Sequence, residues 1–489
     1  MKININEKTW GSHLISPLLT DLYQLTMAYG YWKHGLHERP AVFHQIFRKN
    51  PFKGNYAVAA GLQTVIDFLK DYHFSELDIS YLSTLRTSNG GALFPPDFLH
   101  YLKKLRFSCD LDAVPEGTVV FPHEPLLRIK GPLIQGQLLE TTLLNLVNFQ
   151  TLIATKASRV REITGANEQI LEFGMRRAQG PDGALSASRA AYIGGCDATS
   201  NVLAGKLFDI PVCGTHAHSW VTVFPDEQSA FSAYTKVMPQ NCTLLVDTYD
   251  TIQGVKNAIE TGKKLRDNGA ELQAIRLDSG DLASLSILAR ELLDKAGFED
   301  TKIIASNSLD EYAIADMKNK GAAVSIWGVG TNLVTAFDHP ALDGVYKLSA
   351  LQNEKGEWEY KIKISEQAVK VSNPGIYQIR RYLKHGVPLA DMMFDEELGV
   401  TTPTSMLTIA SPHTQIEIPE HDEARDVLVP VFRQGQCVMN IEPIQALRER
   451  SLKEVSAFRK GNGDEEYQVG LEDQLHQMKQ ALIAKVNSA

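Results

Sequence analysis

The most regular pattern in the chain is a series of six short apolar runs, each of which ends in polar or glycine residues. The runs are QILEFGMRR (169–177), IPVCGTHAHSW (210–220), TLLVDTYDT (243–251), LQAIRLDSGD (272–281), KIIASNSLD (302–310) and VSIWGVGTN (324–332). Stretches of helical periodicity separate them, which predicts parallel strands that alternate with helices. In a βα barrel the site forms at the carboxyl ends of the strands. The side chains expected on that rim are Arg176, His218, Asp247, Arg276 and Asp278.

The segments on either side of this array follow other patterns. Residues 16–35 have helical periodicity, with Ser16 as the expected N-cap and Gly35 as the stop. Further helices are expected at 57–74, 137–164, 443–459 and 470–487, and within the array at 182–206, 251–268, 280–296 and 310–319. Strands are expected at 41–52 and in 109–135, in an antiparallel meander at 343–382 with a loop at QNEKGEW, and in a hairpin at 430–439.

This order of elements predicts an α/β fold: an irregular, incomplete βα barrel flanked by an α+β sandwich domain built from N- and C-terminal segments. Six clear strands fall short of the eight that close a barrel. The expected boundaries are 1–140 for the N-terminal part of the sandwich domain, 141–340 for the barrel, 341–430 for strands that return to the sandwich, and 431–489 for a C-terminal hairpin and helices.

Composition narrows the class of protein. A net charge of −9 argues against nucleic-acid binding as the main function. No run approaches the roughly 18 apolar residues of a membrane span, and MKININEKTWGSH (1–13) lacks the apolar core of a signal peptide. The five cysteines show no CxxC spacing, which favours a reducing compartment. A cytoplasmic enzyme with small-molecule substrates, without nucleic-acid or membrane partners, is the expectation.

His216 and His218 in GTHAHSW leave three interpretations open. On a strand, residues two apart share a face, so the two rings could form a metal pair as in barrel metallohydrolases. The later strand ends supply carboxylates but no histidine, which makes a metal site less favoured. His218 could instead accept a phosphoryl group, with a carboxylate fixing its tautomer. The third interpretation is a hydrogen-bonded structural histidine, which the spacing favours for His216.

Two strand ends carry pairs of carboxylates. Asp250 and Asp281 stand where helices begin, so helix capping explains them. Asp247 and Asp278 come directly at the ends of apolar runs, where capping is a poorer explanation. Magnesium binding, ribose hydroxyls or support of a histidine would suit these two positions.

The remaining candidates concern anions and aromatic rings. Arg176 and Arg276 at strand ends could bind a carboxylate or phosphate bidentately, whereas Arg177 is expected in a salt bridge. The glycines of WGVGTN (327–332) offer backbone N–H groups to a phosphate. Phe173 could stack on an aromatic ligand, although core packing is the commoner role of a phenylalanine. Tyr23 would be assigned to the core from its pattern alone.

Nine motifs spread over nearly the whole chain add a resemblance. They are LLTDLYQLTMAYGYW, FRKNPF, EFGMRRAQGPDGALSASRAAYIGG, GTHAHSWV, LVDTYDT, IRLDSGDL, ASNSLDEY, WGVGTNL and GVYKL. Together they resemble the nicotinate phosphoribosyltransferase family, a type II phosphoribosyltransferase family. The resemblance implies that nicotinate and 5-phosphoribosyl 1-diphosphate give nicotinate mononucleotide and diphosphate, the first step of NAD salvage from nicotinate. It also implies hydrolysis of ATP to ADP and phosphate, coupled through a phosphohistidine, with Mg²⁺ as the metal.

The family's functional residues carry over by motif match. His218, in AHS, would be the phosphorylated histidine, held by Asp247. The groups that the resemblance assigns to nicotinate are Thr215, Arg276, Phe173 on one face of the ring, and Tyr23 contributed by the partner of a homodimer. Those assigned to phosphates are Gly328, Gly330 and Thr331 for the ribose phosphate, and Arg48 and Lys49 across the dimer. The metal ligands are left open.

Two alternatives remain at this point. A nicotinamide phosphoribosyltransferase would have the same fold and an amide substrate, although the stretch RRAQGPDGA favours the acid-using form. A barrel metallohydrolase that binds metal through His216 and His218 belongs to a different class of enzyme.

Overall fold

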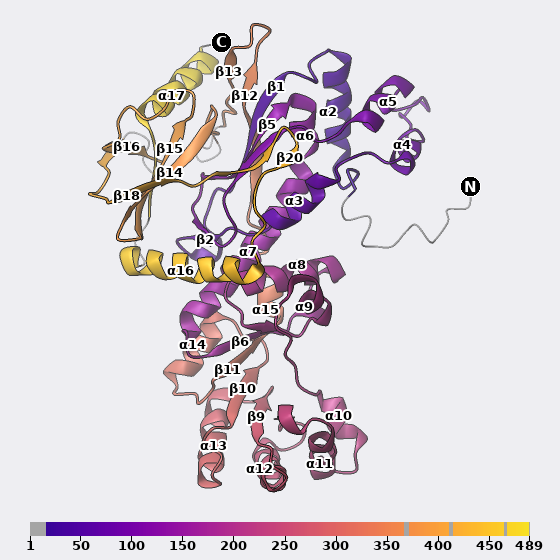
Figure 1. The fold of residues 1–489 in the computed structure, drawn as a ribbon, viewed down its shortest axis with the longest axis vertical. Coiled ribbons are helices and arrows are strands. Elements are labelled where there is room, and N and C mark those ends of the chain that lie inside the picture. The colour runs from indigo at the N-terminus through magenta and orange to yellow at the C-terminus, as the bar shows by residue number, and fades with distance from the viewer. Residues whose placement is uncertain (1–15, 366–370, 410–413, 464–466, 489) are drawn as a thin grey trace. The chain divides into compact units, whose positions relative to one another are not determined.

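The computed structural model describes residues 16–365, 371–409, 414–463 and 467–488. The segment 1–13, in which no signal peptide is expected, lies outside these residues. The chain divides into two compact units. Unit 1 consists of residues 1–151, 341–443 and 453–489, and unit 2 of residues 152–340 and 444–452. Each unit is described by itself (Figure 1).

Unit 2 is built on a six-stranded parallel sheet with the strand order β7-β6-β11-β10-β9-β8. Its strands are β6 (Gln169–Glu172), β7 (Ala198–Thr199), β8 (Cys242–Leu245), β9 (Leu272–Leu277), β10 (Lys302–Ser306) and β11 (Ile326–Val329). The edge strands β7 and β8 do not pair with each other, so the sheet is an open half-barrel. The predicted α/β fold with an incomplete barrel is confirmed.

Helices alternate with these strands. They are α8 (Gly180–Ile193), α9 (Val202–Phe208), α10 (His218–Val223), α11 (Glu227–Val237), α12 (Thr251–Asp267), α13 (Leu282–Lys295), α14 (Glu311–Asn319) and α15 (Thr331–Val334), with 3-10 turns η3 (Met175–Arg177) and η4 (Pro239–Asn241). Several of these helices have an aspartate as N-cap, because its side chain accepts a hydrogen bond from a backbone N–H of the first turn. Asp250 accepts from Gln253 N at 2.7 Å and Asp281 from Ser284 N at 3.4 Å, which confirms both as helix caps.

Two predictions for this unit were wrong. Residues 210–220 do not form a strand, since only an isolated bridge from Val212 to Thr199 continues the sheet there and α10 begins at His218. The sheet strand at this place is instead β7, a two-residue element inside the predicted helix 182–206. The GTHA segment between Val212 and α10 is polar and contains glycine, which explains why the ladder is not sustained.

At Gly254, α12 lies directly against the backbone of Val246, the residue after β8. A Cβ at this position would stand 1.9 Å from the backbone oxygen of Val246, so backbone would have to move. We expect Gly254→Ala to lower the free energy of unfolding by about 1–3 kcal/mol, the usual cost of overpacking. Gly30 in α2 (Leu22–Lys33) is the matched control, because its Cβ would meet nothing within 4 Å. Gly30→Ala should stabilise by about 0.4–1 kcal/mol. Urea unfolding of both variants tests this, and equal shifts would contradict the packing argument.

Unit 1 contains two large sheets and a two-stranded one. The seven-stranded antiparallel sheet has the order β13-β12-β1-β5-β3-β19-β20 and the six-stranded mixed sheet the order β17-β16-β21-β15-β14-β18, while β2 pairs with β4. The strands are β1 (Pro40–Ile46), β2 (Ala57–Val58), β3 (Asp110–Ala113), β4 (Val119–Val120), β5 (Pro125–Pro132), β12 (Val345–Gln352), β13 (Trp358–Tyr360), β14 (Tyr377–Lys384), β15 (Val387–Asp395), β16 (Ser405–Thr408), β17 (Gln415–Glu417), β18 (Glu423–Asp426), β19 (Val429–Arg433), β20 (Gln436–Cys437) and β21 (Gln468–Leu471). N-terminal and C-terminal strands therefore share sheets, as predicted for the sandwich domain.

The helical elements of unit 1 are α2, η2 (Pro51–Lys53), α3 (Leu62–Lys70), α4 (Glu76–Leu82), α5 (Pro96–Lys104), α6 (Leu133–Leu138) and α17 (Asp473–Asn487), while α7 (Glu140–Thr164) and α16 (Ile444–Asn462) belong to both units. Two helices of this unit begin later than predicted. Ser16 caps a turn, with its Oγ accepting from Leu18 N, and α2 begins only at Leu22. The segment 57–74 begins with β2, and Gly61 in the left-handed region separates it from α3.

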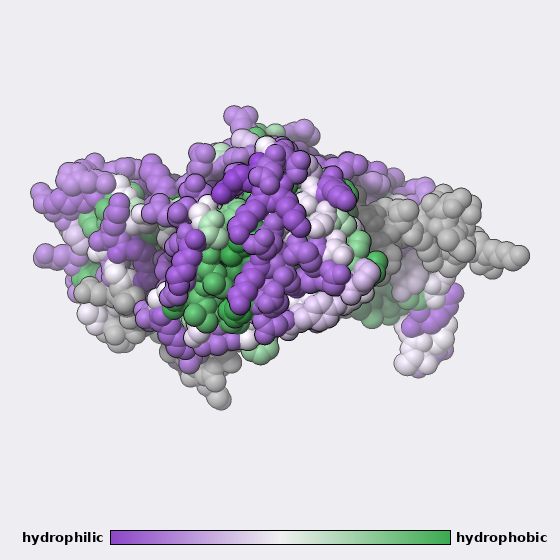
Figure 2. Space-filling model, turned by 90° about the horizontal axis from the view of Figure 1, so that it is seen from below, coloured by the Kyte–Doolittle hydropathy of each residue, from purple (hydrophilic) through white to green (hydrophobic). Residues whose placement is uncertain are grey.

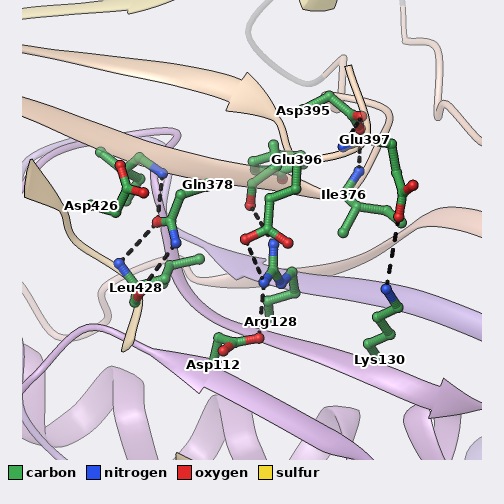
Figure 3. Close-up of polar contacts among 12 residues, drawn as sticks. Asp112, Arg128, Lys130, Ile376, Gln378, Asp395, Glu396, Glu397, Asp426 and Leu428 are labelled. Carbon is green, nitrogen blue, oxygen red and sulfur yellow. Dashed lines mark hydrogen bonds and ion pairs between the residues drawn. The ribbon is translucent and has the colours of Figure 1, made fainter. Parts of the chain in front are cut away.

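An ion pair of Arg128 and amide hydrogen bonds of Gln378 connect the two large sheets of unit 1 (Figure 3). Arg128 on β5 donates from Nη2 to Asp112 on β3 and to Glu396 just after β15, both at 2.9 Å. Gln378 on β14 exchanges two hydrogen bonds with the backbone of Leu428, beside β19. Arg128 is only 4% exposed, so its guanidinium has little contact with water. The carboxylates of Asp112 and Glu396 provide the polar partners that a buried charge needs.

The surface is mainly hydrophilic in the view of Figure 2, and hydrophobic residues gather in a few patches. In the part of the chain that the structure describes, none of the helices combines the length and apolar character needed to cross a membrane.

Candidate active site

Reactive side chains gather at the carboxyl edge of the unit 2 sheet. The predicted residues found at or just after strand ends are Phe173 and Arg176 after β6, Asp247 after β8, Arg276 and Asp278 at the end of β9, and Gly328, Gly330 and Thr331 around the end of β11. Thr215 and His218 come from the segment that follows β7. This is the edge where parallel α/β sheets place their sites.

Arg276 is the centre of the hydrogen-bond network. Its Nε donates to Ser306 Oγ at 2.9 Å, one Nη to Thr215 Oγ1 at 3.0 Å and the other Nη to Asp278 Oδ1 at 2.9 Å. The guanidinium lies 5.4 Å from the centre of the Phe173 ring. An arginine has five N–H groups, and three of them have partners among the described residues. Two N–H groups therefore remain for an anion beside an aromatic face.

Asp278 joins this arginine to the histidine. Its Oδ1 accepts from Arg276 and from Ser306 Oγ, while its Oδ2 lies 3.8 Å from Nε2 of His218. Burial by itself would raise the pKa of Asp278, but the hydrogen bond from Ser306, the adjacent Arg276 and His218 outweigh burial and lower the pKa. The carboxyl group is thus held ionised beside the Arg276 guanidinium.

His218 is the first residue of α10, and 43% of its side chain is exposed. Its Nδ1 lies 3.1 Å from Thr248 Oγ1, and its Nε2 faces Asp278. The hydrogen bond with the Thr248 hydroxyl orients the ring, and the Asp278 carboxylate lies near its other nitrogen. The ring is therefore oriented and partly open to solvent.

His216 has a different environment. Its Nε2 accepts from Leu245 N at 3.2 Å, its Nδ1 lies 3.4 Å from the oxygen of Ala217, and its ring packs edge-on against Tyr234. Burial, with the positive charge of Arg276 nearby, lowers the pKa of His216, so the ring is neutral at pH 7. With both nitrogens directed at backbone, His216 does not form a metal pair with His218. In the described residues no group of three or more His, Cys, Asp or Glu side chains is arranged to hold a metal ion.

Asp247 lies next to this arrangement, and its hydrogen bonds among the described residues go to the turn after β9 and not to His218. Its Oδ2 accepts from Asp278 N at 2.8 Å and from Ser279 Oγ at 2.7 Å. Its Oδ1 is buried and has no hydrogen-bond partner among the described residues. The resemblance assigns Asp247 to His218, but the structure brings Asp278 to that ring and uses Asp247 to hold the turn that carries Asp278.

Gly328 and Gly330, around the end of β11, differ in how much of their role the structure shows. A Cβ on Gly328 would stand 2.8 Å from the Phe173 ring, so only glycine leaves the space that the ring occupies. Gly330 precedes α15, which begins at Thr331. The expected phosphate-binding role of Gly328, Gly330 and Thr331 stays a prediction, whereas the packing role of Gly328 is visible.

Arg176 and Tyr23 are not part of the network around Arg276. Arg176 lies in η3, where both it and Arg177 are exposed. Tyr23 belongs to α2 of unit 1 and is 48% exposed, so it is not a core residue.

Several polar residues of the site were missed in the sequence. Thr248, Ser279 and Ser306 contact the predicted residues, and each lies at or next to the end of an apolar run, the same signal that singled out Asp247. Asn307 and Ser308, directly after β10, have φ values of 106° and 45°. Left-handed conformations of residues other than glycine are costly and concentrate at functional sites.

Comparisons with known proteins identify the family. Sequence models described as the N-terminal domain, the family and the C-terminal domain of nicotinate phosphoribosyltransferase (NAPRTase) match residues 18–148, 168–374 and 376–479, respectively. The chain belongs to the nicotinate phosphoribosyltransferase family. The nicotinate phosphoribosyltransferase of Bacillus subtilis (strain 168) is 43% identical over 96% of both chains. That of Homo sapiens is 34% identical over 96% of this chain and 97% of its own.

Solved structures agree with this assignment. The crystal structure of human nicotinic acid phosphoribosyltransferase has a TM-score of 0.81 at 31% identity and covers 95% of this chain and 99% of its own. The predicted enzyme class, nicotinate phosphoribosyltransferase, is confirmed, and the metallohydrolase alternative is set aside.

Proposed function

We propose that the carboxyl edge of unit 2 joins nicotinate to 5-phosphoribosyl 1-diphosphate and releases diphosphate. The observation that carries this proposal is the pairing of Arg276 with Phe173, which presents two N–H groups beside an aromatic ring. Nicotinate has a carboxylate on an aromatic ring, so the arginine would bind the carboxylate while Phe173 covers one face of the ring. Thr215 and Asp278 fix the orientation of the guanidinium and complete this subsite.

The reaction forms a bond between the ring nitrogen and C1 of ribose and breaks the bond from C1 to the diphosphate oxygen. The ring nitrogen already has a lone pair, so the chain needs no general base. Its residues instead orient the two substrates and stabilise charge. Gly330 and Thr331, at the backbone turn before α15, would bind the ribose phosphate, and Arg176 on η3 would contribute positive charge to the substrate anions.

Asp247 fits a Mg²⁺ ion. Its Oδ1 is a buried carboxylate oxygen without a hydrogen-bond partner in the described residues, and Mg²⁺ in phosphate-transfer sites is held by one or two carboxylates together with substrate phosphates. When bound there, Mg²⁺ would neutralise charge on the diphosphate. Asp247 meanwhile holds the turn of Asp278 and Ser279 through its other oxygen.

His218 is proposed to couple ATP hydrolysis to the reaction. A ring nitrogen would accept the γ-phosphoryl group while ADP leaves, and water would later release phosphate. Thr248 and Asp278 orient the ring, and Asp247 acts on it indirectly by fixing Asp278. A phosphorylated ring changes the local charge beside Asp278, which is the differential interaction that a coupled step needs.

A homodimer is proposed from unit 1. Leu22, Tyr23 and Met27 are 53%, 48% and 38% exposed on one helix, α2, and gathered exposed apolar side chains mark interaction surfaces. We propose that this surface meets a second copy, so that Tyr23 reaches the nicotinate subsite of the partner. Arg48 and Lys49 would reach the phosphates bound by the partner. Arg48 lies near two lysines, Lys347 and Lys363: burial and the charges of Arg48 and Lys363 lower the pKa of Lys347, although Glu140 raises it.

The cellular location is proposed from the thiols. The described structure holds the five cysteines unpaired, as a reducing compartment such as the cytoplasm would keep them.

The coupling role is tested by His218→Ala. We expect the variant to form nicotinate mononucleotide without stimulation by ATP and to incorporate no acid-labile phosphate from γ-labelled ATP, because the acceptor nitrogen is missing. Nicotinate mononucleotide formation is followed with and without ATP for both proteins. His339→Ala is the control histidine, and its ATP stimulation should equal that of the wild type.

Equal ATP stimulation of wild type and His218→Ala would refute the coupling role. Replacing nicotinate with nicotinamide in the same assay tests the substrate, and a higher kcat/KM with nicotinamide would refute the acid preference assigned to Arg276.

A further inference from the structure

Glu172, the last residue of β6, is a buried carboxylate that the proposed reaction does not use. It is 1% exposed. Its Oε1 accepts from Gly174 N, and its Oε2 accepts from Ser188 Oγ at 2.8 Å and from Thr199 Oγ1 at 2.6 Å. All three donors are neutral. A carboxylate buried among neutral donors is costly unless each of its hydrogen bonds is kept, so this network has little freedom.

The donors come from three elements that surround the end of β6. Ser188 lies on α8 and Thr199 on β7, and Asn201, the N-cap of α9, adds hydrogen bonds to both hydroxyls. The third donor, Gly174, follows Phe173 directly. The carboxylate therefore connects two rigid elements to the backbone turn that carries the aromatic ring.

The same turn is fixed on its other side by β11 and α15. Phe173 N donates to the oxygen of Val329 at 2.8 Å, and a Cβ on Gly174 would stand 2.3 Å from Val334. Gly328 leaves the space for the ring itself. Phe173 is thus held between Glu172 and β11, with its ring 5.4 Å from the Arg276 guanidinium.

We propose that Glu172 is a positioning residue that sets the Phe173 ring relative to Arg276 and so determines how tightly the nicotinate ring is held. Glu172 does not touch substrate, and it acts through the Gly174 N–H. This inference rests on the proposed function, because it assumes that Phe173 and Arg276 bind nicotinate. A displaced ring would lose its stacking geometry, whereas the phosphoribosyl subsite at Gly330 and Thr331 would be unchanged.

Glu172→Gln tests the proposal with the smallest change in shape. Glutamine has a single acceptor oxygen, so when that oxygen accepts from Gly174 N its amide N–H groups face Ser188 and Thr199, whose hydroxyls must turn from donating to accepting. We expect KM for nicotinate to rise about tenfold, from weakening one charge-assisted hydrogen bond, with KM for 5-phosphoribosyl 1-diphosphate within about twofold of wild type. Ser188→Ala, which removes one donor only, should shift KM for nicotinate in the same direction by a smaller factor.

A double-mutant cycle separates positioning from general loosening. In Phe173→Leu the ring that Glu172 positions is gone, so adding Glu172→Gln should change KM for nicotinate by less than about twofold. Glu168→Gln is the matched control: this carboxylate precedes the amino end of β6, where it accepts from Trp327 Nε1 at 2.6 Å and pairs with Lys318. It should leave both KM values unchanged.

Three results would overturn the proposal: an unchanged KM for nicotinate in Glu172→Gln, an equal rise of both KM values, or additive effects with Phe173→Leu. If Glu172→Gln does not fold, Ser188→Ala is judged by the same criteria. Failure of the proposed function looks different, because the wild-type enzyme would then form no nicotinate mononucleotide at all.

Discussion

Arg276→Met is expected to lower kcat/KM for nicotinate by about 10³-fold. For 5-phosphoribosyl 1-diphosphate, kcat/KM should fall only because kcat falls, and KM should not change. The variant loses two charge-assisted hydrogen bonds to the carboxylate, each worth about 1.5–3 kcal/mol, and every 1.4 kcal/mol is about tenfold. It also leaves Asp278 beside the substrate anion without its guanidinium partner. Steady-state kinetics with each substrate varied in turn measures both effects.

A lysine at this position sharpens the test. Arg276→Lys keeps the charge but not the planar fork, so most of the loss should remain, since an ammonium cannot serve Ser306, Thr215, Asp278 and a carboxylate together. Arg266→Met, an exposed arginine paired with Glu271, is the control and should be fully active. Full activity of Arg276→Lys would show that charge alone matters and would contradict the proposed bidentate contact.

Arg381→Met should destabilise unit 1 by about 3–5 kcal/mol, the cost of breaking a buried ion pair on one side. Arg381 on β14 is 0% exposed; its Nε and Nη2 donate to Asp391 at 2.9 and 2.6 Å, and Nη2 also reaches the oxygen of Val119. Burial alone would lower the pKa of Arg381, but the charge of Asp391 outweighs it and raises the pKa well above the usual value. Removing the guanidinium leaves the Asp391 carboxylate buried without its cation, with Tyr467 Oη still donating to Oδ1 at 3.0 Å.

The neighbouring arginine on the same strand is a close control. Arg380 pairs with Asp426 at the surface, where the two side chains are 31% and 42% exposed. Arg380→Met should therefore cost at most about 1 kcal/mol. Urea unfolding followed by far-UV circular dichroism compares the two variants, and equal losses would contradict the assignment of stability to the buried pair.

The sequence was sufficient for most of the barrel because apolar runs and helix caps are local signals. Strands β6, β9, β10 and β11 lie within predicted runs, β8 begins one residue before its run, and Asp250 and Asp281 cap the predicted helices. The prediction of a strand at 210–220 was wrong because the apolar start of this run is followed by the polar segment GTHA, which leads into α10. Strand β7 was missed, since two residues are too short to produce a pattern of alternation.

The partners within the site were not predictable from the sequence. Asp247 and Asp278 both end apolar runs, and nothing local distinguishes which carboxylate faces His218. That choice depends on the register of β8 and β9 and on the turn at Ser279, which are tertiary features. Glu172 was missed for the opposite reason, because a carboxylate at a strand end looks exposed until the three donors around it are known.

The discontinuity of unit 1 has a consequence for synthesis of the chain. Strands β1, β5 and β3 are made early and pair with one another, but their outer neighbours β12 and β19 begin at residues 345 and 429. At roughly 5–20 residues per second, about 15–60 s pass between the completion of β1 and the arrival of β12. During that time the nascent sheet has two open edges, which invite pairing with other chains. Protection of the new chain from aggregation therefore depends on the last third of its sequence, whose strands cover the open edges of the strands that are made first.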